Sequence, residues 1–284
     1  MSENFDSLVS TQWLSEHLGT AGLVVLDASR HLPDAQRDPG LEYEAGHIPG
    51  ALFLDLAALV DHASDVPQAL PSADQLAKRL AALGIEPDGR IVLYDDSAVK
   101  TSARAWFTLT AHGIENVAIL DGGLAKWRKE GRALESDTAK IEPIAPRSLH
   151  EAGNVRTKAD MLANLATGEE QVLDARAADR VFGTGTDPVH GGRNGRIPGS
   201  LNLPFGAVFN ADGTYKSAED LRAAFANAGV DLDRPVVTSC GSGITASVLL
   251  FALHLVGKSD TALYDGSWME WEADPDTPKA QGPA

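Results

Sequence analysis

The single cysteine of the chain, Cys240, is the residue whose type and setting point most directly to chemistry. It follows the apolar run 236–238, and Gly241 and Gly243 separate it from an apolar helical pattern over 248–256. Ligands bind at the carboxyl ends of the strands in open α/β sheets. Glycines let a loop curl so that its N–H groups point inward, and with the positive end of a helix they stabilise an anion. This setting favours the thiolate, the nucleophilic form of cysteine.

Two other interpretations of Cys240 compete with a reactive thiol. A lone cysteine is often a buried packing residue, but the flanking glycines and the strand–loop–helix setting argue against that role. A cysteine-based phosphatase needs an arginine six positions after the cysteine to clamp phosphate oxygens, and this chain has Ala246 there. The loop therefore suits a smaller group, such as a single sulfur atom.

The elements around the cysteine are repeated in the first half of the chain. The matching segments are 24–30 with 172–176, 47–51 with 196–200, 91–96 with 235–240, and 120–123 with 264–267. Their order is the same and their separation stays between 144 and 149 residues. A period of this size predicts a duplicated domain. We expect domains over residues 1–140 and 155–284, joined within 135–154, where prolines and a glycine interrupt any periodicity.

Each half alternates short apolar runs with helical patterns. The predicted strands are 23–26, 91–94 and 117–120 in the first half, and 171–173, 236–238 and 261–264 in the second. Ser72 and Ser217 precede leucine-bearing helical patterns as N-caps. Near-continuous apolar runs are typical of parallel strands buried on both faces. The pattern predicts an α/β fold with an open, mainly parallel sheet flanked by helices in each domain.

The amino-acid composition excludes some classes of binding partner. The net charge of −16 argues against nucleic acid or an anionic membrane surface, which both need clustered basic residues. The polar N-terminus shows no secretory signal, and the longest apolar run, 248–256, is too short to cross a bilayer. One cysteine permits no internal disulfide, which suits the cytoplasm. We therefore expect a cytoplasmic protein without a metal site or cofactor.

These residues resemble a known family. The loop Cys240-Gly-Ser-Gly-Ile-Thr is similar to the active loop of 3-mercaptopyruvate sulfurtransferases, members of the two-domain rhodanese family. The motifs that start at His47 and Tyr264 are similar as well, and the resemblance extends from about Leu23 to Trp271. Thiosulfate-preferring members usually carry basic residues in the two positions after the cysteine, where this chain has glycine and serine.

The resemblance implies a sulfur-transfer reaction. In the family only the C-terminal domain carries the reactive cysteine, and the site lies between the domains. Cys240 would take sulfur from 3-mercaptopyruvate, a small anionic donor, and release pyruvate. The Cys240 persulfide would pass its sulfur to a thiol such as thioredoxin or a low-molecular-weight thiol, or to cyanide. Two half-reactions through one covalent intermediate give ping-pong kinetics. In the first half, Asp96 aligns with Cys240 and cannot carry sulfur.

The resemblance also implies roles for other residues. A serine two positions after the cysteine delivers a proton together with a histidine and an acid of the first domain, which match Ser242, His47 and Asp38. Without the resemblance, Ser242 is equally well explained as a loop cap and His47 as a turn residue.

For the substrate carboxylate, Arg180 matches one of two family arginines. The second position is Val189, so Arg193, Arg196 or a protonated His190 would have to replace it. The remaining expected contacts come from the loop residues Gly241, Gly243, Ile244 and Thr245.

Two further functions stay open at this point. A thiosulfate sulfurtransferase would use the same cysteine with a different donor. A non-catalytic sulfur-binding regulatory module would keep the fold without turnover, although such modules often lack the cysteine that this chain retains.

Overall fold

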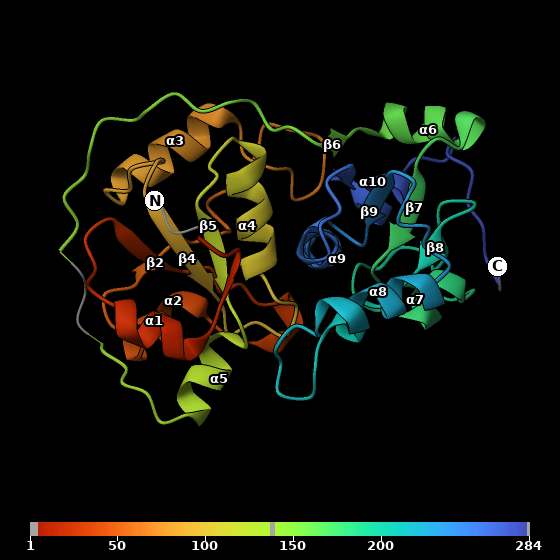
Figure 1. Cartoon of the computed structure of the whole chain (residues 1–284). Coiled ribbons are helices and arrows are strands. Elements are labelled where there is room, and N and C mark those ends of the chain that lie inside the picture. The colour runs from red at the N-terminus through yellow and green to blue at the C-terminus, as the bar shows by residue number, and fades with distance from the viewer. Residues whose placement is uncertain (1–4, 137–139, 283–284) are drawn as a thin grey trace. The chain divides into compact units, whose positions relative to one another are not determined.

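A computed structural model describes residues 5–136 and 140–282 of the chain, and they form two compact units. The first unit runs to Asp61 and includes Leu70–Gly153 and Asn210–Tyr215. The second includes His62–Ala69, Asn154–Phe209 and the chain from Lys216 onward. In Figure 1 the colours run from red to green through most of the first unit and from green to blue through most of the second.

The first unit is built on a five-stranded parallel sheet with the order β1-β5-β4-β2-β3. Its strands are β1 (Leu8–Val9), β2 (Leu23–Asp27), β3 (Leu52–Phe53), β4 (Arg90–Tyr94) and β5 (Val117–Leu120). Its helices are α1 (Thr11–His17), α2 (Pro39–Ala45), α3 (Ala73–Ala82), α4 (Ser102–Ala111) and α5 (Gly123–Lys129), with a 3-10 turn at Pro33–Ala35.

The second unit repeats this topology with the order β6-β10-β9-β7-β8. Its strands are β6 (Val155–Arg156), β7 (Gln171–Asp174), β8 (Leu201–Asn202), β9 (Val236–Ser239) and β10 (Thr261–Tyr264). Its helices are α6 (Lys158–Thr167), α7 (Ala178–Phe182), α8 (Ala218–Asn227), α9 (Ile244–Leu255) and α10 (Ser267–Ala273), with a 3-10 turn at Phe205–Val208. The expected α/β fold with two duplicated parallel sheets is therefore confirmed.

The strands are buried on both faces, as their apolar runs predict. In the first unit, Val25 and Val92 pack with Leu14 of α1 and Trp127 of α5. In the second unit, Val237 belongs to a cluster that also contains Trp268 and Trp271 of α10. No helix in the described part of the chain is long and apolar enough to cross a membrane.

The predicted elements agree with the structure at most positions. All six predicted strands are present with ends within one residue, and both serine N-caps accept a backbone hydrogen bond, Ser72 from Gln75 and Ser217 from Asp220. The helix expected over 248–256 instead begins at Ile244, directly after the cysteine loop.

Of the expected join, residues 137–139 lie outside the described ranges. The stretch 140–153 contains no helix or strand, and Ile144 and Gly153 donate backbone hydrogen bonds to Ala81 and Ala111 of the first unit.

Candidate active site

Cys240 follows β9 directly, and Gly243 caps the start of α9. The loop that joins β9 to α9 is therefore only four residues long, from Cys240 to Gly243. Gly243 has a φ of 80°, a left-handed conformation that glycine adopts without a steric penalty. This turn brings the thiol to the carboxyl end of a central strand and to the positive end of a twelve-residue helix. The local setting expected from the sequence is present.

Ser267, the first residue of α10 just after the neighbouring strand β10, braces the loop. Its hydroxyl oxygen accepts hydrogen bonds from the backbone N–H groups of Cys240 and Gly243, both at 3.1 Å, and its O–H donates to the carbonyl of Tyr264. The sequence showed this serine only as part of the repeated segment 264–267 and predicted no role for it. Its place just after the strand beside β9 was the signal, because the ends of adjacent parallel strands meet at one edge of the sheet.

Three further N–H groups lie in this loop and in the first turn of α9. In residues 5–136 and 140–282, no protein group accepts a hydrogen bond from the N–H of Ser242, Ile244 or Thr245. The Cys240 side chain is buried at 2% exposure. Hydrogen-bond donors around a buried centre act in a low local dielectric, which strengthens their interaction with negative charge.

Two arginines and two carboxylates form a buried cluster on the same unit. Arg176 is fully buried and binds both carboxylate oxygens of Asp174, while its guanidinium carbon lies 4.8 Å from the Trp268 ring centroid. Arg180 donates to one oxygen of Asp187 through Nε at 3.1 Å and Nη2 at 2.8 Å. Burial is the largest single influence and raises the pKa of Asp187, but the hydrogen bond and charge of Arg180 and the N–H groups of Val189 and His190 together outweigh it and lower this pKa. The sequence prediction included Arg180 and missed Arg176.

The two other candidate arginines have protein partners. Arg193 is a surface residue whose Nε donates to Glu272 at 2.9 Å. Arg196 is 6% exposed, its Nη1 donates to the carbonyl of Gly282, and its guanidinium lies over the Phe182 ring. These contacts account for both side chains without a substrate, so a role for Arg193 or Arg196 in binding stays a prediction.

Asp38 and His47 belong to the first unit. Asp38 is the N-cap of α2 and accepts hydrogen bonds from the N–H groups of Gly40 and Leu41. His47 is completely buried, its ring stacks on Tyr43 at 4.0 Å, and its Nδ1 lies 2.7 Å from the Tyr43 carbonyl. Both residues thus have local structural roles, and their part in proton delivery stays a prediction.

The residue of the first unit that corresponds to Cys240 is Asp95, and the alignment of Asp96 with Cys240 was wrong. In the first sheet Asp27 pairs with Tyr94, and in the second its counterpart Asp174 pairs with Ser239. The next residue after each strand is therefore Asp95 or Cys240. The same equivalence follows from two carbonyl acceptors, since Leu124 N–H donates to Asp95 and Trp268 N–H donates to Cys240. Two apolar runs can be aligned with a shift of one residue, and the hydrogen-bond register of the strands shows which of the two alignments is right.

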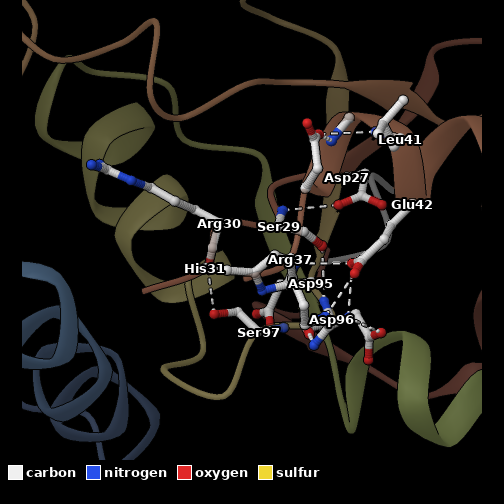
Figure 2. Close-up of polar contacts among 12 residues, drawn as sticks. Asp27, Ser29, Arg30, His31, Arg37, Leu41, Glu42, Asp95, Asp96 and Ser97 are labelled. Atoms are coloured by element: carbon white, nitrogen blue, oxygen red, sulfur yellow. Dashed lines mark hydrogen bonds and ion pairs between the residues drawn. The ribbon is translucent and has the colours of Figure 1, made fainter. Parts of the chain in front are cut away.

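Asp95 and Asp96 have different surroundings, which Figure 2 shows. Asp95 is 5% exposed, and its two oxygens accept hydrogen bonds from the N–H groups of Ser97 and Ser102. Asp96 lies nearer the surface and forms ion pairs with Arg37 at 2.9 Å and Arg128 at 3.0 Å. The first unit therefore fills its strand-end loop with an internal carboxylate.

A comparison with protein families assigns the chain. The rhodanese-like domain matches residues 10–130 and again residues 157–274, most of the chain. The chain belongs to the rhodanese family. Two rhodanese-like domains in tandem were expected, and the family match confirms them.

Individual relatives cover the rhodanese chain almost completely. The 3-mercaptopyruvate sulfurtransferase of Mus musculus is 39% identical over 94% of this chain and 92% of its own length. A thiosulfate sulfurtransferase of Cricetulus griseus is 37% identical over 98% of this chain and 96% of its own length. Among solved structures, SseA from Escherichia coli, described with the 3-mercaptopyruvate sulfotransferases, aligns with a TM-score of 0.84 at 35% identity. That alignment covers 92% of this chain and 98% of SseA.

Proposed function

We propose that this rhodanese-family protein is a sulfurtransferase that moves sulfur from 3-mercaptopyruvate to a thiol or cyanide through a persulfide on Cys240. The observation that supports this proposal most directly concerns the Cys240 loop and the start of α9. The N–H groups of Ser242, Ile244 and Thr245 have no protein acceptor in the described part of the chain. Such preorganised donors stabilise negative charge that develops during a reaction.

The first half-reaction loads the cysteine. The Cys240 thiolate attacks the donor sulfur, an S–S bond forms, and the C–S bond breaks. The electron pair of the C–S bond leaves with the three-carbon fragment as the enolate of pyruvate. The proton of the donor thiol returns at carbon 3, which gives pyruvate. Ser242 is our candidate for guiding this proton, because its hydroxyl makes no hydrogen bond with the described residues.

The second half-reaction unloads the cysteine. An acceptor thiolate attacks the outer sulfur of the persulfide, and Cys240 leaves as a thiolate ready for the next cycle. A low-molecular-weight thiol or thioredoxin would end as a persulfide, and cyanide would end as thiocyanate. Each acceptor attacks the same outer sulfur, so the reaction at Cys240 is the same whichever acceptor is used in the cell.

For the donor carboxylate we propose Arg180. Asp187 holds two of its nitrogens, and in the described part of the chain no protein group accepts from its Nη1. Its side chain is 14% exposed, so the free edge can meet a small anion. Asp187 thus orients the guanidinium while a donor site remains open.

Mass spectrometry tests the central step. After incubation with 3-mercaptopyruvate, wild-type protein should gain the mass of one sulfur atom on the peptide that contains Cys240, and pyruvate should appear in equal amount. Cys240→Ser should show neither while keeping the wild-type circular dichroism spectrum. Sulfur transfer at the wild-type rate by Cys240→Ser would refute the mechanism.

Thiosulfate is the second candidate donor, supported by the relative from Cricetulus griseus that is named for it. We expect a higher kcat/KM for 3-mercaptopyruvate, because Gly241 and Ser242 place no fixed cation beside the transferred sulfur. Faster turnover of thiosulfate would reverse the assignment of the donor and keep the persulfide.

A further inference from the structure

His190 lies directly against the loop that holds Cys240. A Cβ atom built on Gly241, the residue after the cysteine, would overlap with Nε2 and Cδ2 of the His190 ring. The imidazole therefore occupies the space that any side chain at position 241 would need.

The loop between α7 and β8 presents this ring in a defined orientation. One carboxylate oxygen of Asp187 accepts hydrogen bonds from the N–H groups of Val189 at 2.9 Å and His190 at 3.3 Å. The other oxygen holds Arg180. The residue that orients the proposed carboxylate ligand thus also positions the backbone of His190, so both side chains are set by one buried acid.

The charges that face His190 come from three parts of the unit. Arg180 on α7 and Arg176 after β7 disfavour its protonation, and Asp187 on its own loop favours it. Burial is the largest influence, and together with the two arginines it lowers the pKa of His190 below 6.5. His190 also contacts Gly241 of the Cys240 loop. The lowered pKa favours the uncharged imidazole at neutral pH, and the ring nitrogens have no hydrogen-bond partner among the described side chains.

We propose that His190 is a specificity-determining residue of the donor site, which stands beside the transferred sulfur as a neutral group at neutral pH and as a cation in acid. This inference rests on the proposed sulfurtransferase function. In 3-mercaptopyruvate the carboxylate is two carbons away from the carbon that bears sulfur. In thiosulfate the charged sulfonate oxygens are on the atom bonded to the transferred sulfur. A neutral His190 leaves that position without a cation and discriminates against thiosulfate, and protonation removes the discrimination.

Two variants at position 190 test this role with purified full-length protein. His190→Gln keeps a neutral polar side chain at every pH, and His190→Lys adds a permanent cation. The measurement is kcat/KM for 3-mercaptopyruvate and for thiosulfate between about pH 5 and about pH 8, with the variants compared with wild type at each pH. This comparison cancels the titration of the donors and of the cysteine.

The expected pattern is specific. Relative to His190→Gln, the wild-type preference ratio of thiosulfate over 3-mercaptopyruvate should rise on the order of tenfold from the alkaline to the acid end. His190→Lys should keep a raised ratio throughout. His254→Gln is the matched control, because His254 lies at the far end of α9 and its pKa is also lowered by burial. It should follow the wild-type curve.

The outcomes separate this inference from the proposed function. If neither donor places sulfur on Cys240, the proposed function fails. If Cys240 is loaded but His190→Gln and wild type show the same ratio at every pH, the role of His190 is refuted. Should His190→Lys unfold, the comparison of His190→Gln with wild type decides alone.

Discussion

Asp95 directly follows strand β4, at the position where Cys240 directly follows strand β9. The two residues share the same register, and each carbonyl accepts a hydrogen bond from the helix that follows the adjacent strand. In the second unit, N–H groups of the strand-end loop that carries the thiol have no acceptor among the described residues. In the first unit the Asp95 carboxylate accepts two loop N–H groups itself. The same strand-end position therefore carries a thiol in one unit and an internally hydrogen-bonded carboxylate in the other.

Removing the Asp95 carboxylate should destabilise the protein much more than removing that of Asp96. Asp95→Ala leaves the buried N–H groups of Ser97 and Ser102 without acceptors, at a cost of about 1–3 kcal/mol. Asp96→Ala breaks partly exposed ion pairs and should cost less than about 1 kcal/mol. Urea denaturation of both variants measures the difference. Equal losses would show that the two carboxylates are not placed as described.

Ser267 should matter for both stability and sulfur transfer. In Ser267→Ala, the N–H groups of Cys240 and Gly243 lose their common acceptor, which should cost about 1–3 kcal/mol and lower kcat. Ser247→Ala is the control, since this serine is equally buried and, among the described residues, its hydroxyl donates only to the carbonyl of Gly243. Thermal unfolding and steady-state kinetics of the two variants give the test. A normal kcat in Ser267→Ala would mean that the brace is dispensable for the loop.

The buried pair of Arg176 and Asp174 should be among the most sensitive sites in the second unit. Arg176→Met leaves the Asp174 carboxylate buried without its partner, and such losses cost about 3–5 kcal/mol. Arg156→Met removes the more exposed pair with Glu170 and should cost less than about 1 kcal/mol. Denaturation midpoints of the two variants provide the measurement, and a mild effect of Arg176→Met would contradict the buried charge pair.

Stability should depend on pH through His190. Its pKa in the folded protein is lowered below 6.5 by burial and by Arg180, so the unfolded chain binds the proton more tightly. The neutral ring is therefore favourable above pH 6.5, and this contribution is lost as the pH falls below that value. His190→Gln lacks the effect. The free energy of unfolding of wild type minus that of His190→Gln should decline as the pH decreases from about 7 to about 5. A constant difference would show that the pKa is not lowered.

Features that depend on neighbours along the chain could be predicted from the amino-acid sequence alone. Apolar runs such as 117–120 and 261–264 predicted strands with the observed ends, and the repeated motifs predicted two similar parallel sheets. The glycines after Cys240 predicted a loop at a strand end that opens a helix. These predictions hold because strand propensity, helix capping and the conformational freedom of glycine are local properties.

Which chain segments contact one another became clear from the folded structure. The two-residue strands β1, β3, β6 and β8 are too short to leave a periodic pattern, and they form because a neighbouring strand offers an unpaired edge. Ser267 reaches the cysteine loop because β9 and β10 are adjacent strands. Asp95 corresponds to Cys240 because the two residues occupy the same position in the pairing register of their sheets. His190 meets Gly241 across about fifty residues of sequence. Such contacts depend on sheet order and side-chain packing, which distant parts of the chain settle together.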